Sequence, residues 1–193
     1  MISYKESLEI LKVTDALLDG HFILSSGLHS SQYIQCAKLL SKPNLANILC
    51  QSLALKIKNE FTNIDLILSP AMGGVIIGYE IGKILKKETI FAERLNRIFS
   101  LRRGFEIKKS SNVLIVEDVI TTGKSSLECS SLVNDAKANI LGYACIIDRS
   151  NGKSIINKKI ISQVQINIPS YDEKNLPEDL LLIKPTKPGS RDL

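Results

Sequence analysis

The sequence predicts one α/β domain whose central, mostly parallel sheet is flanked by helices. Short apolar runs rich in β-branched residues alternate with stretches of helical periodicity, which is the order expected of a parallel sheet covered on both faces. The chain has 193 residues, enough for one domain with a full core, and its 44% hydrophobic and 23% charged residues are usual for a globular protein. It has no internal repeat, linker or low-complexity segment, so residues 1–193 are expected to form a single domain.

The N-terminal part predicts a helix and a hairpin. Apolar side chains recur at helical spacing in residues 5–18, and Asp19-Gly20 is expected to end the helix. The next segment, HFILSSGLHSSQYIQ (21–35), is rich in Ser and Gly and predicts a strand, a turn and a second strand. Its two histidines are expected to be solvated.

The rest of the chain predicts the core of the domain. Pro43-Asn44 can open a helix that runs to about Glu60. Four short apolar runs then predict buried strands: IDLILSP (64–70), TIFAE (89–93), VLIVE (113–117) and GYACIID (142–148). Helices are expected at 75–87 and from about Lys124 to Ala136. The proline-bearing, polar segment 171–193 is expected to finish as a loose tail.

Composition excludes several classes of protein. The four cysteines (Cys36, Cys50, Cys129 and Cys145) are far apart, so we expect buried thiols and neither a zinc site nor a disulfide framework. No apolar run approaches the roughly 18 to 20 residues that span a bilayer. The N-terminus, MISYKESLEI, is mixed and amphipathic instead of basic and then apolar. We therefore expect a cytoplasmic protein without a membrane partner.

The formal charge of +5 is concentrated in RLNRIFSLRRGFEIKK (94–109). This segment holds six cations and one acid, so the remainder of the chain is formally neutral. A local cationic loop suits a small polyanion better than a long nucleic acid, which usually needs a basic stripe interleaved with aromatic residues. We expect no nucleic-acid partner; the alternative is a solvated basic surface loop.

The stretch VLIVEDVITTGKSS (113–126) carries most of the chemistry. Its Gly123-Lys124-Ser125 suggests the P-loop, but the first glycine of that pattern would fall at position 118, which is Asp118. The P-loop is therefore excluded. The turn before the expected helix still offers unpaired N–H groups and the positive end of the helix dipole to a phosphate.

Side chains around this turn extend the site. Hydroxyl donors are available from Thr121, Thr122, Ser125 and Ser126. Glu117 and Asp118, expected just at the exposed end of the strand, can accept hydrogen bonds from a sugar diol or hold a hydrated Mg²⁺ through its water. The segment therefore suits a ribose 5-phosphate.

Two other unusual segments also follow strands. They are residues 69–74 and Asp148-Arg149. In an open α/β sheet, ligands bind beyond the carboxyl ends of the strands, so we expect these segments to converge on 117–126.

VLIVEDVITTGKS (113–125) resembles the phosphoribosyl-pyrophosphate (PRPP) signature of type I phosphoribosyltransferases: a hydrophobic strand, two acids, two apolar residues and then T-x-G-x-[ST]. The resemblance implies the fold of that family, with a small N-terminal hood. It also implies that PRPP is bound by Glu117, Asp118, Val119, Ile120, Thr121, Thr122, Gly123, Lys124 and Ser125.

Further segments are similar to those of orotate phosphoribosyltransferases. They are HFILSSGLHSSQY (21–33), LSPAMGGVIIG (68–78), FAER (91–94), DRSNG (148–152) and KPGSR (187–191). The resemblance implies transfer of the phosphoribosyl group from PRPP to orotate, giving orotidine 5′-monophosphate and pyrophosphate in de novo pyrimidine biosynthesis. It also implies that Thr121 and Arg149 contact orotate.

The same resemblance implies a homodimer and a need for Mg²⁺. The ion would be carried by PRPP, through water to Asp118, without direct protein ligands. The implied division is an N-terminal helix and base-binding hood at 1–42, an α/β core at 43–170 and a C-terminal tail at 171–193.

The cationic segment departs from the family's R-K-x-x-K-x-H-G catalytic loop. Arg94 matches the first arginine, but residues 95–104 contain no lysine and no histidine, and Gly73 stands where the same relatives have a lysine. We therefore expect arginines to meet the leaving pyrophosphate. The expected catalytic residues are Glu117, Asp118, Arg94, Arg97, Arg102 and Arg103.

Two alternatives remain open. A purine or uracil phosphoribosyltransferase would keep the PRPP site and lose the role of Arg149. A PRPP-binding regulator would keep the fold and bind nucleic acid, generally through an added domain or a basic face.

Overall fold

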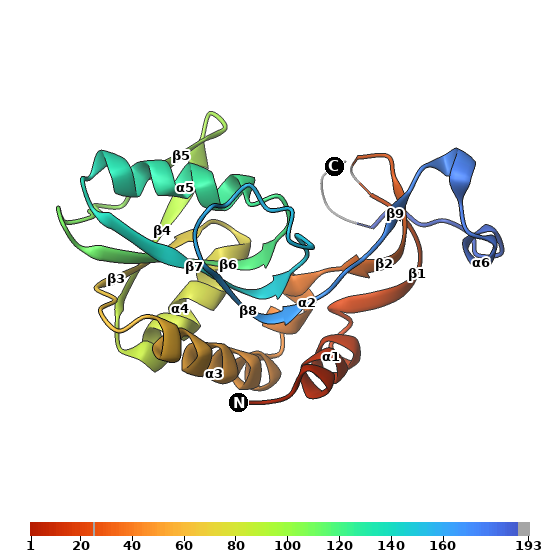
Figure 1. Cartoon of the computed structure of the whole chain (residues 1–193), viewed down its shortest axis with the longest axis horizontal. Coiled ribbons are helices and arrows are strands. Elements are labelled where there is room, and N and C mark those ends of the chain that lie inside the picture. The colour runs from red at the N-terminus through yellow and green to blue at the C-terminus, as the bar shows by residue number, and fades with distance from the viewer. Residues whose placement is uncertain (25, 189–193) are drawn as a thin grey trace.

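A computed structural model describes residues 1–24 and 26–188, which form a six-stranded sheet and a smaller three-stranded sheet beside it (Figure 1). The large sheet has the order β5-β4-β3-β6-β7-β8. Its strands are β3 (Leu66–Pro70), β4 (Glu88–Leu95), β5 (Ile98–Leu101), β6 (Asn112–Ile120), β7 (Asn139–Asp148) and β8 (Ile160–Gln165). Only the β4–β5 pair is antiparallel, which confirms the predicted mostly parallel α/β sheet.

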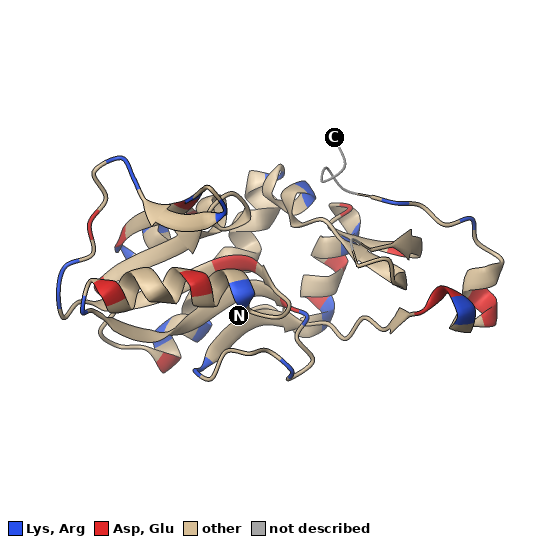
Figure 2. Ribbon diagram, turned by 90° about the horizontal axis from the view of Figure 1, so that it is seen from above, with Lys and Arg blue, Asp and Glu red and all other residues tan. Residues whose placement is uncertain are grey.

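Helices cover both faces of this sheet. Helices α3 (Pro43–Glu60) and α4 (Gly73–Leu85) lie on one face and α5 (Lys124–Asp135) lies on the other (Figure 1). Successive side chains of a strand point to opposite faces, so Leu114 belongs to the core under α3 and α4, while Ile115 belongs to the core under α5. The three helices were predicted within about two residues. Charged residues lie mostly on helices and loops, and the central strands are largely free of them (Figure 2).

Strand β6 is longer than predicted. The sequence placed its end at Glu117, but Val119 and Ile120 still pair with Ile147 and Asp148 of β7. On the other side, pairing with β3 stops at Ile115. Glu117 and Asp118 therefore lie within β6, in the part that pairs with β7 alone, and not beyond the strand as expected.

The cationic segment is not wholly a loop, which corrects a second prediction. Leu95 of β4 pairs with Ile98 of β5, and the two residues between them, Asn96 and Arg97, have φ angles of 50° and 70°. Two successive residues with positive φ make the tight turn that suits the twist of a hairpin. The first half of the segment is thus part of a β-hairpin that the end of β4 forms with β5.

The first helix, α1 (Tyr4–Val13), is shorter than predicted. Asp15 has a φ of 56°, and the Ala16 N–H donates to the Leu11 carbonyl at 2.8 Å, so a left-handed residue closes the helix. The chain then enters the predicted hairpin of β1 (Leu17–Ile23) and β2 (His29–Ile34). A short helix, α2 (Cys36–Leu40), follows and was not predicted.

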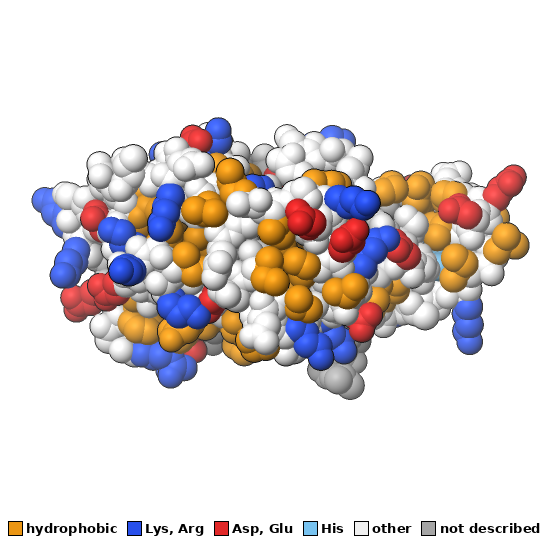
Figure 3. All heavy atoms as spheres, turned by 90° about the horizontal axis from the view of Figure 1, so that it is seen from below, with side chains coloured by type: hydrophobic (Ala, Val, Ile, Leu, Met, Phe, Trp, Pro, Cys, Tyr) orange, Lys and Arg blue, Asp and Glu red, His pale blue; other side chains and the backbone are white. Residues whose placement is uncertain are grey.

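The C-terminal segment is tied to the hairpin over residues 170–186, so the expected loose tail is wrong for this part. Strand β9 (Ser170–Tyr171) pairs with β2 and completes the three-stranded sheet. Beyond it lie a 3₁₀ turn (Glu173–Asn175) and α6 (Glu178–Leu181). The Ile23 N–H donates to the Thr186 carbonyl at 2.8 Å. Exposed hydrophobic side chains gather at the α6 end, where Leu182 is 88% exposed (Figure 3).

A buried histidine pair adds to this anchor. His21 Nε2 lies 2.6 Å from His29 Nδ1, and His21 Nδ1 donates to the Ile183 carbonyl at 2.8 Å. Both histidines are buried, so the expectation that they are solvated was wrong. The end of the KPGSR segment, from Gly189 onward, lies outside the described residues.

The four cysteines are free and buried, as predicted. Within the described ranges, no helix has both the length and the hydrophobicity needed to cross a bilayer.

Candidate active site

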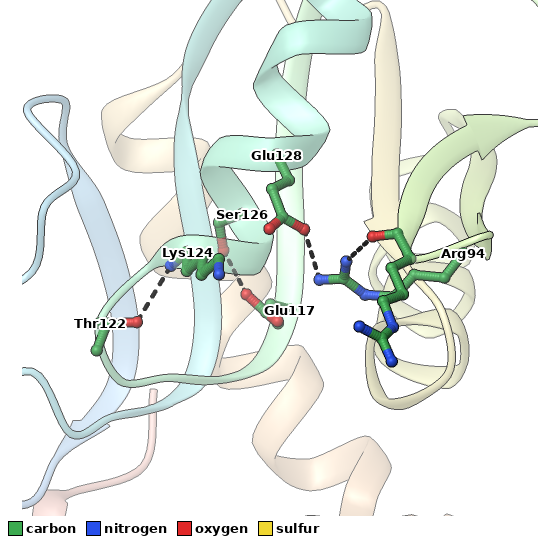
Figure 4. Close-up of polar contacts among 7 residues, drawn as sticks. Arg94, Glu117, Thr122, Lys124, Ser126 and Glu128 are labelled. Carbon is green, nitrogen blue, oxygen red and sulfur yellow. Dashed lines mark hydrogen bonds and ion pairs between the residues drawn. The ribbon is translucent and has the colours of Figure 1, made fainter.

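Glu117 and Asp118 point to opposite faces of β6. Ser126, in the first turn of α5, donates its hydroxyl to the Glu117 carboxylate (Figure 4). Asp118 faces α4: one of its oxygens accepts the Val119 N–H at 2.9 Å, and a Cβ placed on Gly73 would lie 2.5 Å from the other. The two carboxylates therefore reach the same end of the sheet from different sides.

Burial shifts both acids toward their neutral forms. It raises the pKa of Glu117 to about 7, opposed by the hydrogen bond from Ser126, raised further by the Asp118 charge and lowered by Arg94. Burial also raises the pKa of Asp118, against the Val119 N–H. These carboxylates can accept hydrogen bonds from hydroxyls, and Glu117 changes its charge near neutral pH.

The turn between β6 and α5 has the shape of a phosphate cradle. Gly123 has a φ of 84°, and a Cβ there would lie 2.7 Å from Ser154 Oγ, so the position favours glycine. The Ile155 N–H donates to the Thr122 carbonyl at 3.0 Å and supports the turn from behind. Thr121, Thr122 and Lys124 are exposed. The Lys124 N–H donates to the Thr122 hydroxyl at 3.3 Å (Figure 4), so the next N–H groups of α5 and these side chains are the donors available to an anion.

Ser126 does not belong to this cradle. Its hydroxyl was expected to face a phosphate, but it is buried and bonded to Glu117 instead. The physical reason is the helix geometry: α5 begins at Lys124 and turns Ser126 inward over β6.

Two of the four arginines, Arg94 and Arg103, are paired with acids. Arg94 forms an ion pair with Glu128 of α5 at 2.5 Å, donates to the Arg97 carbonyl at 2.6 Å and lies 4.1 Å from the centre of the Phe99 ring (Figure 4). Arg103 donates to both carboxylate oxygens of Glu93, at 2.9 and 3.0 Å. Arg94 thus ties β4 to α5, whereas Arg103 ties the turn after β5 back to β4 within the hairpin.

The other two arginines are exposed. Within the part of the chain that the structure describes, the guanidinium groups of Arg97 and Arg102 make no hydrogen bond or ion pair. Arg97 lies in the hairpin turn, beyond the end of β4. These two side chains are therefore available to a ligand without breaking an existing contact.

Arg149 lies where the core meets the hairpin of β1 and β2. Its N–H donates to the Ile120 carbonyl at 2.8 Å, which places it beside Thr121. Burial lowers the pKa of its guanidinium, against the influence of Tyr33 of β2. The side chain is half-buried and remains cationic, because an arginine keeps its charge at neutral pH.

The structure thus brings together Glu117, Asp118, the 121–125 turn and Arg149, with Arg94 nearby. Ser126 contacts Glu117, Glu128 contacts Arg94, and Glu93 contacts Arg103 of the cationic segment. Sequence patterns did not indicate these contacts, because each depends on how elements pack. No group of three or more His, Cys, Asp or Glu among residues 1–24 and 26–188 could hold a metal ion by itself.

Comparison with known proteins identifies the family. The phosphoribosyl transferase domain matches residues 37–180. The chain is 44% identical over 188 residues to an orotate phosphoribosyltransferase of Erythrobacter litoralis, covering 97% of each protein. It is 45% identical over 190 residues to the enzyme of that name in Methylorubrum populi, covering 98% of this chain and 97% of the relative.

Solved structures agree on the fold. The crystal structure of orotate phosphoribosyltransferase from Aeropyrum pernix has a TM-score of 0.72 at 22% identity, covering 82% of this chain and 92% of that one. An adenine phosphoribosyltransferase from Saccharomyces cerevisiae has a TM-score of 0.65 at 20% identity, covering 83% and 99%. The resemblance first seen in the PRPP signature is confirmed: the chain belongs to the phosphoribosyl transferase domain family and, within it, to the orotate phosphoribosyltransferases.

Proposed function

We propose that this protein transfers the 5-phosphoribosyl group of PRPP to orotate, giving orotidine 5′-monophosphate and pyrophosphate in de novo pyrimidine biosynthesis. The observation that carries the proposal is the meeting of two carboxylates, a phosphate-sized turn and a half-buried arginine at one end of the sheet. Relatives over 40% identical along nearly the whole chain bear the name of this activity.

PRPP is proposed to bind along residues 117–125. Backbone N–H groups at the start of α5, with Thr121, Thr122, Lys124 and Ser125, would hold the 5′-phosphate. Glu117 and Asp118 would accept hydrogen bonds from the ribose hydroxyls and so fix the sugar, a positioning role and not acid–base chemistry.

Asp118 is proposed to hold a hydrated Mg²⁺ through one of its waters. One Asp118 oxygen accepts the Val119 N–H, and the other faces the start of α4, where it can accept a hydrogen bond from a metal-bound water. When bound, the ion would offset the negative charge of pyrophosphate. The protein's own contribution there is the orientation of the carboxylate.

Cationic side chains are proposed to stabilise the leaving group. Breaking the C1–O bond develops positive charge on the ribose and negative charge on pyrophosphate, as in glycoside cleavage. Arg97 and Arg102 have free guanidinium groups that can meet this charge, while Arg94 and Arg103 keep the hairpin in place.

Orotate is proposed to lie between Thr121 and Arg149, under the hairpin of β1 and β2. A guanidinium can bind a carboxylate through two parallel hydrogen bonds, and orotate carries such a carboxylate. Partial burial of Arg149 strengthens this interaction because less water competes for it.

One assay separates this proposal from its alternatives. Consumption of orotate is followed by its absorbance with PRPP and Mg²⁺, beside parallel reactions with hypoxanthine, adenine and uracil. Turnover of orotate alone supports the proposal. Turnover of a purine or of uracil, with no turnover of orotate, would show that the acceptor base is not orotate. PRPP binding without turnover of any base would favour a PRPP-binding regulator.

We also propose that the protein is a cytoplasmic homodimer. Met72, just before α4, and Ile76 and Tyr79 on the helix recur at helical spacing and are 85%, 53% and 66% exposed. An exposed apolar stripe of this kind is typical of a protein–protein contact. A second copy that covers the stripe would lie close to the Asp118 side of the site, because α4 begins at Gly73.

A further inference from the structure

Ser126 is a buried donor whose acceptor is a proposed substrate-binding group. It has 0% exposure and donates its hydroxyl to the Glu117 carboxylate. One turn later, Ser130 Oγ contacts the Ser126 carbonyl at 3.0 Å and the Tyr143 hydroxyl of β7. The Ser130 hydroxyl thus faces β7, whereas the Ser126 hydroxyl faces Glu117.

A second partner for Glu117 lies on the same face of the sheet. Arg94 of β4 points toward α5, as Glu117 does, and lowers the pKa of that acid. Arg94 is held by Glu128, two residues after Ser126 (Figure 4). Helix α5 thus supplies one partner for the acid and another for the arginine.

We propose that Ser126 is a positioning residue, whose hydroxyl holds the Glu117 carboxylate toward the ribose of PRPP and keeps it from pairing with Arg94. This inference rests on the proposed role of Glu117 in binding PRPP. A carboxylate has about four acceptor positions, so Glu117 can keep Ser126 as a donor and still accept a ribose hydroxyl. If the hydroxyl were lost, the buried carboxylate would turn to Arg94, the remaining donor on that side.

Titration calorimetry with PRPP and Mg²⁺ tests this without any acceptor base. Ser126→Ala is expected to raise the Kd for PRPP about tenfold, comparable to the loss of one hydrogen bond to a charged group. Steady-state kinetics, measured separately, are expected to show an unchanged KM for orotate. Ser130→Ala is the matched control, because it removes a buried hydroxyl from the same helix one turn later. It is expected to keep the wild-type Kd.

A double-mutant cycle separates positioning from general damage to the helix. In a Glu117→Ala background, Ser126→Ala is expected to cause no further loss of PRPP affinity, because the hydroxyl acts through the carboxylate. An equal loss in both backgrounds, or wild-type affinity in the single variant, overturns the proposal. Should Ser126→Ala not fold, Ser126→Cys keeps only a weak donor at the same position. A smaller rise in the Kd for PRPP is expected of it, and again no further loss in the Glu117→Ala background.

The outcomes also separate this inference from the proposed function. A wild-type protein that binds no PRPP overturns both. A wild-type protein that binds PRPP and turns over orotate, beside a Ser126→Ala variant that is unaffected, overturns only the positioning role.

Discussion

Gly73 leaves the space that the Asp118 carboxylate occupies. A Cβ on Gly73 would lie 2.5 and 2.6 Å from the two Asp118 oxygens, far inside normal contact. Position 73 is also one of the places where the sequence departs from the pattern that the resemblance implies. In this chain any side chain there would displace the acid, so the departure from the family pattern and the position of Asp118 are linked.

Gly73→Ala is therefore expected to lower kcat/KM for PRPP at least about tenfold, because Asp118 must rotate away from the ribose site. Alanine is a better helix former than glycine, so the melting temperature should not fall. Gly82→Ala is the control on the same helix: its Cβ would meet Thr89, 1.9 Å from Oγ1, so it should lower the melting temperature and leave kcat/KM of the folded protein unchanged. Full activity in Gly73→Ala would show that Asp118 does not need its present position.

Glu117 predicts a pH dependence near neutrality. Burial raises its pKa to about 7, and only the ionised carboxylate has both oxygens available as acceptors. We expect kcat/KM for PRPP to fall about tenfold per pH unit below pH 7 and to level off above it. Glu117→Gln should have a lower kcat/KM for PRPP but should not show this decrease below pH 7. Any pH dependence that remains in the variant then comes from the titration of PRPP itself. If Glu117→Gln shows the same decrease below pH 7 as the wild type, the pH dependence does not come from Glu117.

Titration of Glu117 should also affect the stability of the fold, which should fall with rising pH where kcat/KM rises. Between its ordinary pKa of 4.5 and about 7, Glu117 stays protonated in the folded protein but is ionised in the unfolded chain. The folded state then binds more protons, so its stability falls as the pH rises through this window. Denaturant unfolding at pH 5 and pH 8 should show a larger decrease for the wild type than for Glu117→Gln, which does not titrate.

Periodicity predicted the elements of this fold that bury long apolar runs, such as α3, α4 and the core of β6. It missed β8 and β9, whose pairing depends on distant partners, and it ended β6 at Glu117 because two acids do not suggest a strand. Pairing with β7 nevertheless continues the strand as far as Ile120, against the local preference of the two acids. At the site, the signature located the acids and the turn, whereas the bonds of Ser126 and Glu128 follow from the placement of α5 and have no local pattern.

The pairing of the loop arginines predicts different effects for their alanine variants. Arg97→Ala should lower kcat about tenfold or more with an unchanged melting temperature, because its guanidinium is free to meet the leaving group. Arg103→Ala breaks two hydrogen bonds to Glu93 and should act on the hairpin, with a smaller loss of kcat. Steady-state kinetics beside thermal melts distinguish the two. The reverse order would assign the pyrophosphate contact to Arg103.

The α4 stripe predicts how the proposed dimer can be split. Ile76→Glu places a charge in the middle of the stripe and is expected to give a monomer by sedimentation or light scattering. Leu182→Glu is the control, since it puts the same charge on another exposed apolar position, 88% exposed near α6. A dimer that survives Ile76→Glu and dissociates with Leu182→Glu would move the interface to the α6 end.

Substitution of Arg149 is expected to change the affinity for orotate and not the rate of bond breaking. The orotate carboxylate takes no part in bond breaking, so its partner contributes equally to the ground and transition states. Arg149→Ala should raise the KM for orotate roughly 10- to 100-fold, the loss expected for a charge-assisted pair, with kcat and the KM for PRPP much less affected. Arg149→Lys keeps the charge but loses the paired geometry, so it should restore only part of the affinity. If Arg149→Ala instead lowered kcat at saturating orotate and left its KM unchanged, the residue would act on the transition state, and orotate would have to bind elsewhere.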